Sequence, residues 1–98
     1  MAVNAPTSQE VKRYVEKNFP DSKATFILAS LSKVADFLGS AKVWYQAAIL
    51  MHWQHECNGV PELLDQYIKT VNQDPRDFLL SFGNGPIPFW ERKFTNQD

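Results

Sequence analysis

The chain lacks the surplus of basic charge, the paired cysteines and the long apolar run that would each point to a particular class of protein. Ten lysines and arginines stand against eleven acidic residues, and the net charge is −1. Nucleic-acid binders usually carry a basic excess, because phosphates neutralised by protein release counterions. A nucleic-acid partner is therefore disfavoured. Six of the ten basic residues lie in the first 50, which keeps association through that half as a third, weaker hypothesis.

A single cysteine, Cys57, excludes an internal disulfide and fits a reducing compartment. The first ten residues contain no apolar run typical of a signal peptide. The longest apolar stretch, around residues 47–51, is far too short to span a bilayer. We therefore expect a cytoplasmic protein with no membrane segment. The chain also has no glycine-rich phosphate loop, CxxC pair or calcium-binding loop.

What the chain does have is helical periodicity along most of its length. Ninety-eight residues with 44% hydrophobic content suit one domain with one modest core. The spacing of apolar residues predicts an all-α fold, a compact bundle of about five short helices in a single domain spanning 1–98. We expect residues 1–6 to form a loose arm and residues 84–98 an extended, proline-containing C-terminal tail.

Local capping chemistry predicts the ends of several helices. Thr7 and Glu10 have capping-box spacing at the start of a first helix, which stops before Pro20. Pro61 suits the first position of a fourth helix, where its missing N–H is no loss. Asp74 offers a cap for a short fifth helix, which begins at the proline that follows it.

The second helix leaves one alternative open. Asp21 or Ser22 can cap its start, and its apolar face runs as far as Leu38. Gly39 can then end this helix, with Ser40 capping the next. Alternatively, Gly39 weakens a single long helix from about residue 22 to residue 57, at a cost of about 1 kcal/mol. We prefer the break, because a compact domain needs its apolar faces to meet.

Residues 41–57 are apolar on nearly every side of a helix and predict the central helix of the bundle. Gly59 is expected to end it. On a helical projection Trp53 shares a side with Lys42 and Gln46, the polar strip of this helix. We therefore expect the Trp53 side chain to be partly exposed.

The last two turns of that helix carry both histidines of the chain. His52 and His55 are three residues apart, and His52 and Glu56 four apart, so the three side chains could share a metal such as zinc. No further histidine exists to complete the site, and histidine near a helix C-terminus is favourable in any case. A small metal-binding or histidine-dependent enzyme or sensor built on these residues is the alternative interpretation, and no cofactor is expected.

The preferred interpretation is a non-catalytic protein–protein interaction module: an adaptor, a regulatory subunit or an inhibitor. Large aromatic residues exceed what a small core needs, and tryptophan is enriched where protein surfaces meet. The apolar tail must pack on something, either its own bundle or a partner. The predicted partner-binding residues are Trp53, Ile87, Phe89, Trp90 and Phe94, and the partner is another protein or a second copy of this chain.

Overall fold

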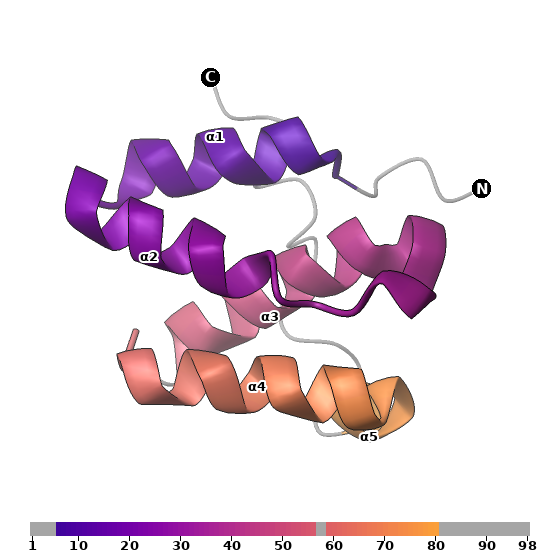
Figure 1. Cartoon of the computed structure of the whole chain (residues 1–98). Helices are drawn as coiled ribbons and strands as arrows, with labels where there is room; N and C mark the ends of the chain where they lie inside the picture. Colours follow the sequence, from indigo (N-terminus) through magenta and orange to yellow (C-terminus); the bar gives the residue numbers. More distant parts are fainter. Residues whose placement is uncertain (1–5, 57–58, 81–98) are drawn as a thin grey trace.

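The computed structural model describes residues 6–56 and 59–80, without the side chains of Glu56, Leu79 and Leu80. These residues form five α-helices and one 3-10 helix, with no strand among them. The elements are α1 (Ser8–Asn18), α2 (Asp21–Leu31), η1 (Asp36–Ala41), α3 (Lys42–Glu56), α4 (Pro61–Gln73) and α5 (Pro75–Leu80). The predicted all-α bundle is confirmed. In Figure 1, α1 and α2 lie above α4, and α3 lies between these layers.

The ends of α1 follow the predicted local chemistry. The Thr7 hydroxyl accepts from the Glu10 backbone N–H at 3.2 Å, and the Glu10 carboxylate accepts from the Thr7 N–H at 2.8 Å. This reciprocal capping box uses two N–H groups that have no partner within the helix. Val11 and Val15 are buried, so α1 presents one apolar stripe to the core. Of the predicted N-terminal arm, Pro6 alone is described, and it is buried.

The start of α2 differs from the prediction. Pro20 occupies the N-cap position and no side chain caps the helix, so the expected cap at Asp21 or Ser22 is wrong. The rigid φ of Pro20, at −64°, begins the helix without a side-chain acceptor.

The end of α2 also differs, since the helix stops at Leu31 instead of continuing to Leu38. Two side chains from other helices hold the backbone that leaves it. Gln46 donates to the Leu31 carbonyl at 2.8 Å. Asn72 accepts from the Ala35 N–H at 2.7 Å and donates to the Lys33 carbonyl at 2.9 Å. These bonds replace the ones that another helical turn would have supplied, because backbone groups near the core need partners.

The chain turns sharply between α2 and α3, so a break is confirmed, but α2 does not end at Gly39. The turn falls at residues 32–35, and Gly39 is a second kink, inside η1. Gly39 has φ 59° and ψ −129°, a conformation open essentially to glycine alone. The direction of the helical chain changes by 118° between Asp21–Leu31 and Asp36–His55. A single long helix is therefore excluded. Among the described residues no one helix is long and apolar enough to cross a membrane, and only this bent pair taken together would be.

The central position of α3 is confirmed by burial. Residues 47–51 are fully buried on all sides, and α3 contacts α1, η1 and α4. Its C-terminal end turns at Gly59, whose φ of 73° is the left-handed conformation expected after a helix. Buried residues of all five helices form one core cluster.

The last two described helices begin as their prolines predict. Pro61 is at the start of α4, which buries Leu64, Ile68 and Val71. The Asp74 carboxylate accepts from the Arg76 N–H at 3.1 Å. It also lies 3.4 Å from the Asp77 N–H, so it caps α5.

Candidate functional site

Trp53 does not lie on the surface, and the prediction of partial exposure is wrong. Its side chain is 0% exposed. The indole Nε1 donates to the Val60 carbonyl at 2.6 Å, and its ring lies 6.2 Å from that of Phe19. The helical projection indicated partial exposure because Trp53 shares a side of α3 with the polar residue Gln46. In the structure, the Gln46 side chain donates to the Leu31 carbonyl at the end of α2 and does not face water. Trp53 therefore anchors the turn between α3 and α4 and offers no surface to a partner.

The other four predicted partner-binding residues, Ile87, Phe89, Trp90 and Phe94, lie outside the described residues. The predicted tail at 84–98 lies outside them as well. Their role in binding, and the question of what the tail packs against, stay predictions.

The two histidines occupy different environments. His52 is 8% exposed, and its ring lies 4.9 Å from Tyr67 and 6.3 Å from Phe78. His55 is exposed, and the side chain of Glu56 is not described. Within residues 6–56 and 59–80, no three His, Cys, Asp or Glu side chains gather as metal ligands would. The predicted third ligand, Glu56, lies outside that search, so the metal interpretation stays a prediction.

An open groove lies where α2 and α4 begin, at the same end of the molecule in Figure 1. We call it the α2–α4 groove, and it is lined by Pro20, Ser22, Lys23, Phe26 and Pro61. Its volume is about 480 Å³, within the range of ordinary ligand sites. Phe26 is 37% exposed there, and Val60, which precedes Pro61, is 42% exposed.

The position of Phe26 follows from the register of α2. Ala24, Ile27 and Leu31 face the core, so Phe26 falls on the flank of that stripe. The two prolines come from helix starts that the core holds near each other. Sequence reasoning missed this site. The available signal was a large aromatic residue out of register with the buried face, but its neighbour Pro61 is 35 positions away in the sequence.

A second hollow, of about 320 Å³, adjoins the α2–α4 groove through a shared residue. We call it the Gln54 hollow, and it is lined by Phe19, Lys23, Gln54 and Gly59. The Tyr14 hydroxyl donates to Gln54 Oε1 at 3.0 Å, which orients the amide. Burial raises the pKa of Tyr14, and the hydrogen bond to Gln54 partly offsets this, so Tyr14 is a neutral donor at pH 7.

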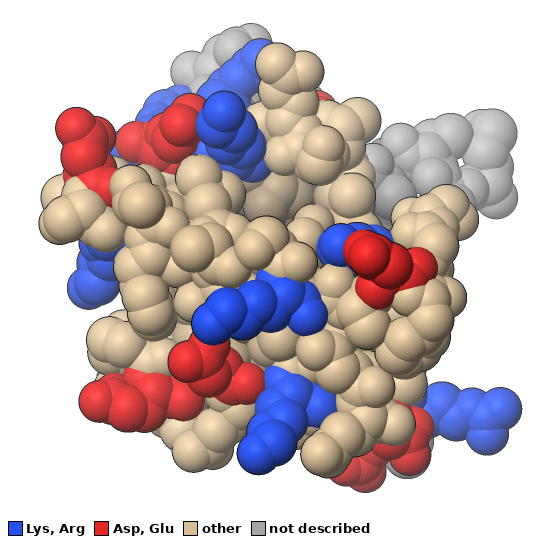
Figure 2. Space-filling view, viewed as in Figure 1, with Lys and Arg blue, Asp and Glu red and all other residues tan. Residues whose placement is uncertain are grey.

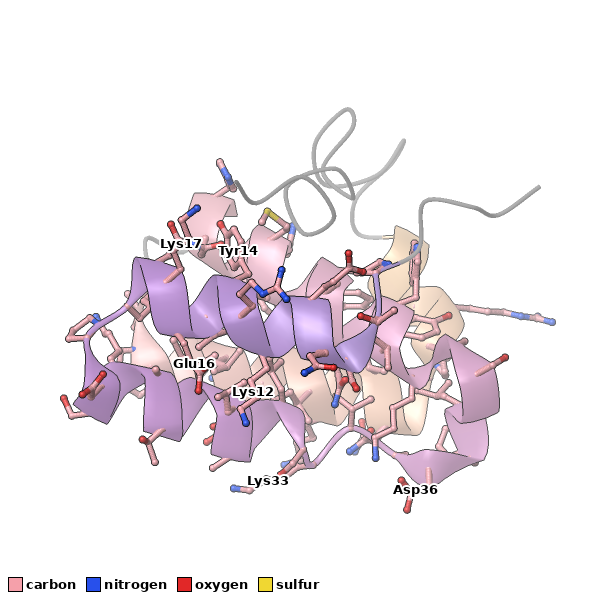
Figure 3. The ribbon with its side chains drawn as sticks, turned by 90° about the horizontal axis from the view of Figure 1, so that it is seen from above. Lys12, Tyr14, Glu16, Lys17, Lys33 and Asp36 are labelled. Carbon is pink, nitrogen blue, oxygen red and sulfur yellow. The ribbon has the colours of Figure 1, made fainter. Side chains whose placement is uncertain are left out.

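Figure 3 separates the polar side chains of α1 into two groups. Lys12 and Glu16 lie on the side of α1 nearer α2, whereas Tyr14 and Lys17 lie on the other side. Basic and acidic side chains are also interspersed over the face seen in Figure 2. This face therefore has no single-sign area of the kind that phosphate backbones require.

One ion pair is present within the described part of the chain, between Lys42 and Asp36. The hydrogen bond from Lys42, together with its charge, lowers the pKa of Asp36. The pair joins η1 to the start of α3 and lies apart from the α2–α4 groove, so its role is structural.

Comparison of the chain with known protein families, with curated proteins and with solved structures found no match. The groove and its chemistry are therefore the basis for a functional proposal.

Proposed function

We propose that this protein is a non-catalytic protein–protein interaction module, an adaptor, regulatory subunit or inhibitor, that binds its partner through the α2–α4 groove. The single observation that supports this is Phe26, a large aromatic side chain left partly in water over an open hollow with proline on two sides. Aromatic anchors that fill pockets supply much of the binding energy at protein interfaces.

The surroundings of Phe26 favour a protein partner over a small substrate. The groove opens widely to solvent, and its lining contains one charged side chain, that of Lys23. Enzyme sites instead bring several titratable or nucleophilic groups together in a recess that excludes water. A shallow apolar surface with a polar margin is typical of a contact between proteins.

A photo-cross-linking experiment tests this proposal. Benzoylphenylalanine replaces Phe26 in one variant and Phe37 in a matched control, and both are expressed in the protein's native cells. Phe37 is 66% exposed on η1 and does not line the groove. Adducts from position 37 therefore measure nonspecific cross-linking at an exposed aromatic position. We expect a discrete adduct from position 26 that position 37 does not give. A second copy of the chain in that adduct identifies a homodimer, and a different protein identifies an adaptor or regulatory role.

Two results would contradict the proposal. One is the same adducts from both positions, and the other is no adduct from position 26 while the variant remains folded by circular dichroism. Either result would show that Phe26 has no specific partner.

A further inference from the structure

We propose that the α2–α4 groove is the contact of a homodimer, in which a second copy of this chain presents the same groove across a two-fold axis. Phe26 of each copy packs against Val60 and Pro61 of the other, and Lys23 of each pairs with Glu62 of the other. This inference rests on the proposed function and commits it to one partner. Its basis is that one end of the molecule carries both halves of each contact.

Exposed apolar side chains gather at this end from two helix starts. Among the described residues three large hydrophobic side chains are exposed, and two of them are Phe26 and Val60. Phe26 lines the groove from α2, whereas Val60 and Pro61 stand at the start of α4. Apolar surface left in water is stabilised by contact with other apolar surface. One contact that covers the starts of α2 and α4 together buries all three side chains.

The charges at the groove are of both signs and are not paired within the chain. Lys23 stands on the α2 side and Glu62, the residue after Pro61, on the α4 side, and both are exposed. In the described part of the chain neither forms an ion pair. Figure 2 shows the same mixture, with acidic side chains above and below basic ones along the edge where α2 and α4 begin. A polyphosphate or an anionic membrane would be repelled by these carboxylates, whereas a partner that carries both signs would not.

A two-fold axis that runs along the groove matches these features with one another. A half-turn about such an axis exchanges the two sides of the face, so α2 of one copy lies opposite α4 of the other. Each Phe26 then meets the apolar start of the opposite α4, and each Lys23 meets a Glu62. The contact is isologous, so every pair forms twice. A face whose two sides carry complementary groups is therefore complementary to itself.

The contact is small, so we expect a weak dimer. Interfaces that bury less than about 1,200 Å² in total are typical of transient complexes. The apolar centre supplies most of the affinity. The exposed ion pairs are weak individually, and they fix which way round the two copies meet.

Sedimentation velocity of the full chain, over concentrations up to millimolar, tests the inference. We expect the wild type to exchange between monomer and dimer. Lys23→Glu and Glu62→Lys, each alone, should raise the dissociation constant at least about tenfold, because each loses both ion pairs and places like charges opposite each other. An equimolar mixture of the two variants should restore dimerisation to within about threefold of wild type, since each supplies the charge that the other now needs.

A second mixture controls for net charge. Lys69→Glu on α4 and Glu16→Lys on α1 are the same substitutions at exposed positions outside the groove, and they give the two chains the same net charges as the test pair. Alone or mixed, they should leave the dissociation constant unchanged. Phe26→Ala should abolish dimerisation, with Phe26→Leu as the conservative variant if Phe26→Ala fails to fold by circular dichroism.

The outcomes separate this inference from the proposed function. A chain that stays monomeric at every concentration, a dimer that either charge variant leaves intact, or a mixture of the two variants that stays monomeric would overturn the homodimer. The photo-cross-linking experiment then decides the proposed function. An adduct with a different protein that is specific to position 26 would leave the proposed function standing, and the absence of any specific adduct would overturn both.

Discussion

Gly39 shows how a single backbone conformation sets the path of this chain. A Cβ at this position would meet no atom within 4 Å, so space does not restrict it. The restriction is its φ of 59° combined with ψ of −129°. Only glycine adopts this combination without strain.

We expect Gly39→Ala to lower the free energy of unfolding by about 1–3 kcal/mol, the cost of forcing a side-chain-bearing residue into that region. Urea denaturation followed by circular dichroism measures this. Ser40→Ala, at the exposed next position, is the control and should change stability by less than about 0.5 kcal/mol. Equal stability of the two variants would show that the turn relaxes to another conformation.

Trp53 is a second single residue on which the fold depends, through the buried hydrogen bond from its indole N–H to the Val60 carbonyl. We expect Trp53→Phe to lower the free energy of unfolding by about 2–4 kcal/mol, because the Val60 carbonyl loses its donor and a small cavity remains. The same denaturation experiment applies. Phe37→Leu is the control, since that side chain is 66% exposed and its change should be close to zero. A Trp53→Phe variant as stable as wild type would contradict an anchoring role.

Among the elements, the junction of η1 and α3 depends on the pair of Asp36 and Lys42. Because the pKa of Asp36 is lower in the folded chain than in the unfolded one, its carboxylate adds stability above the unfolded pKa. That contribution is lost as the pH falls through the folded pKa. An NMR titration of the Asp36 carboxyl carbon should therefore give a midpoint below the usual aspartate value.

The partner of Asp36 is identified by a substitution in the same titration. Lys42→Gln should move the Asp36 midpoint upward, since the hydrogen bond from Lys42 is the main cause of the shift. Lys12→Gln, on α1, should leave it unchanged. A midpoint indifferent to Lys42→Gln would mean that the pair does not persist in solution.

The end of α2 depends on side chains from two other elements. We expect Asn72→Ala to lower the free energy of unfolding by about 1–3 kcal/mol, because the Ala35 N–H and the Lys33 carbonyl both lose their partner. Gln73→Ala, at the exposed neighbouring position of α4, should have little effect. Thermal and urea unfolding of both variants measure the difference, and equal stability would show that water replaces the Asn72 amide at no cost.

The same elements explain how much of the structure the sequence could predict. The starts of α1, α4 and α5 were predicted correctly because each depends on residues within three positions, such as Thr7 with Glu10 and Asp74 with Arg76. The end of α2 was not predicted correctly. The side chains that hydrogen-bond the backbone there, Gln46 and Asn72, are 15 or more positions away in the sequence.

The candidate site was beyond local reasoning for a similar reason. The α2–α4 groove is lined from the start of α2 and the start of α4, and no spacing rule joins Phe26 to Pro61. Trp53 was assigned to the surface because a polar neighbour on a helix suggests water, whereas Gln46 is bonded inside the bundle. A polar side chain that completes another helix looks the same in a sequence as one that faces solvent.

At the scale of the whole molecule, the hydrogen bond from the Ala35 N–H to the Asn72 side chain ties the turn after α2 to α4. Hydrogen exchange at this one amide therefore depends on how the helices pack together. The Ala35 amide lies outside any regular helix, yet its hydrogen-bond acceptor belongs to α4. Its proton exchanges with solvent deuterium when this hydrogen bond opens, and the packing of α4 against the end of α2 opposes that opening. We expect native-state exchange at Ala35 to be as slow as at the core residues of α3, and to become fast in Asn72→Ala while those core amides stay slower. A turn amide that exchanged within seconds in the wild type would mean instead that α4 opens independently. If the expectation holds, protection of this one proton records the docking of residues nearly forty positions apart.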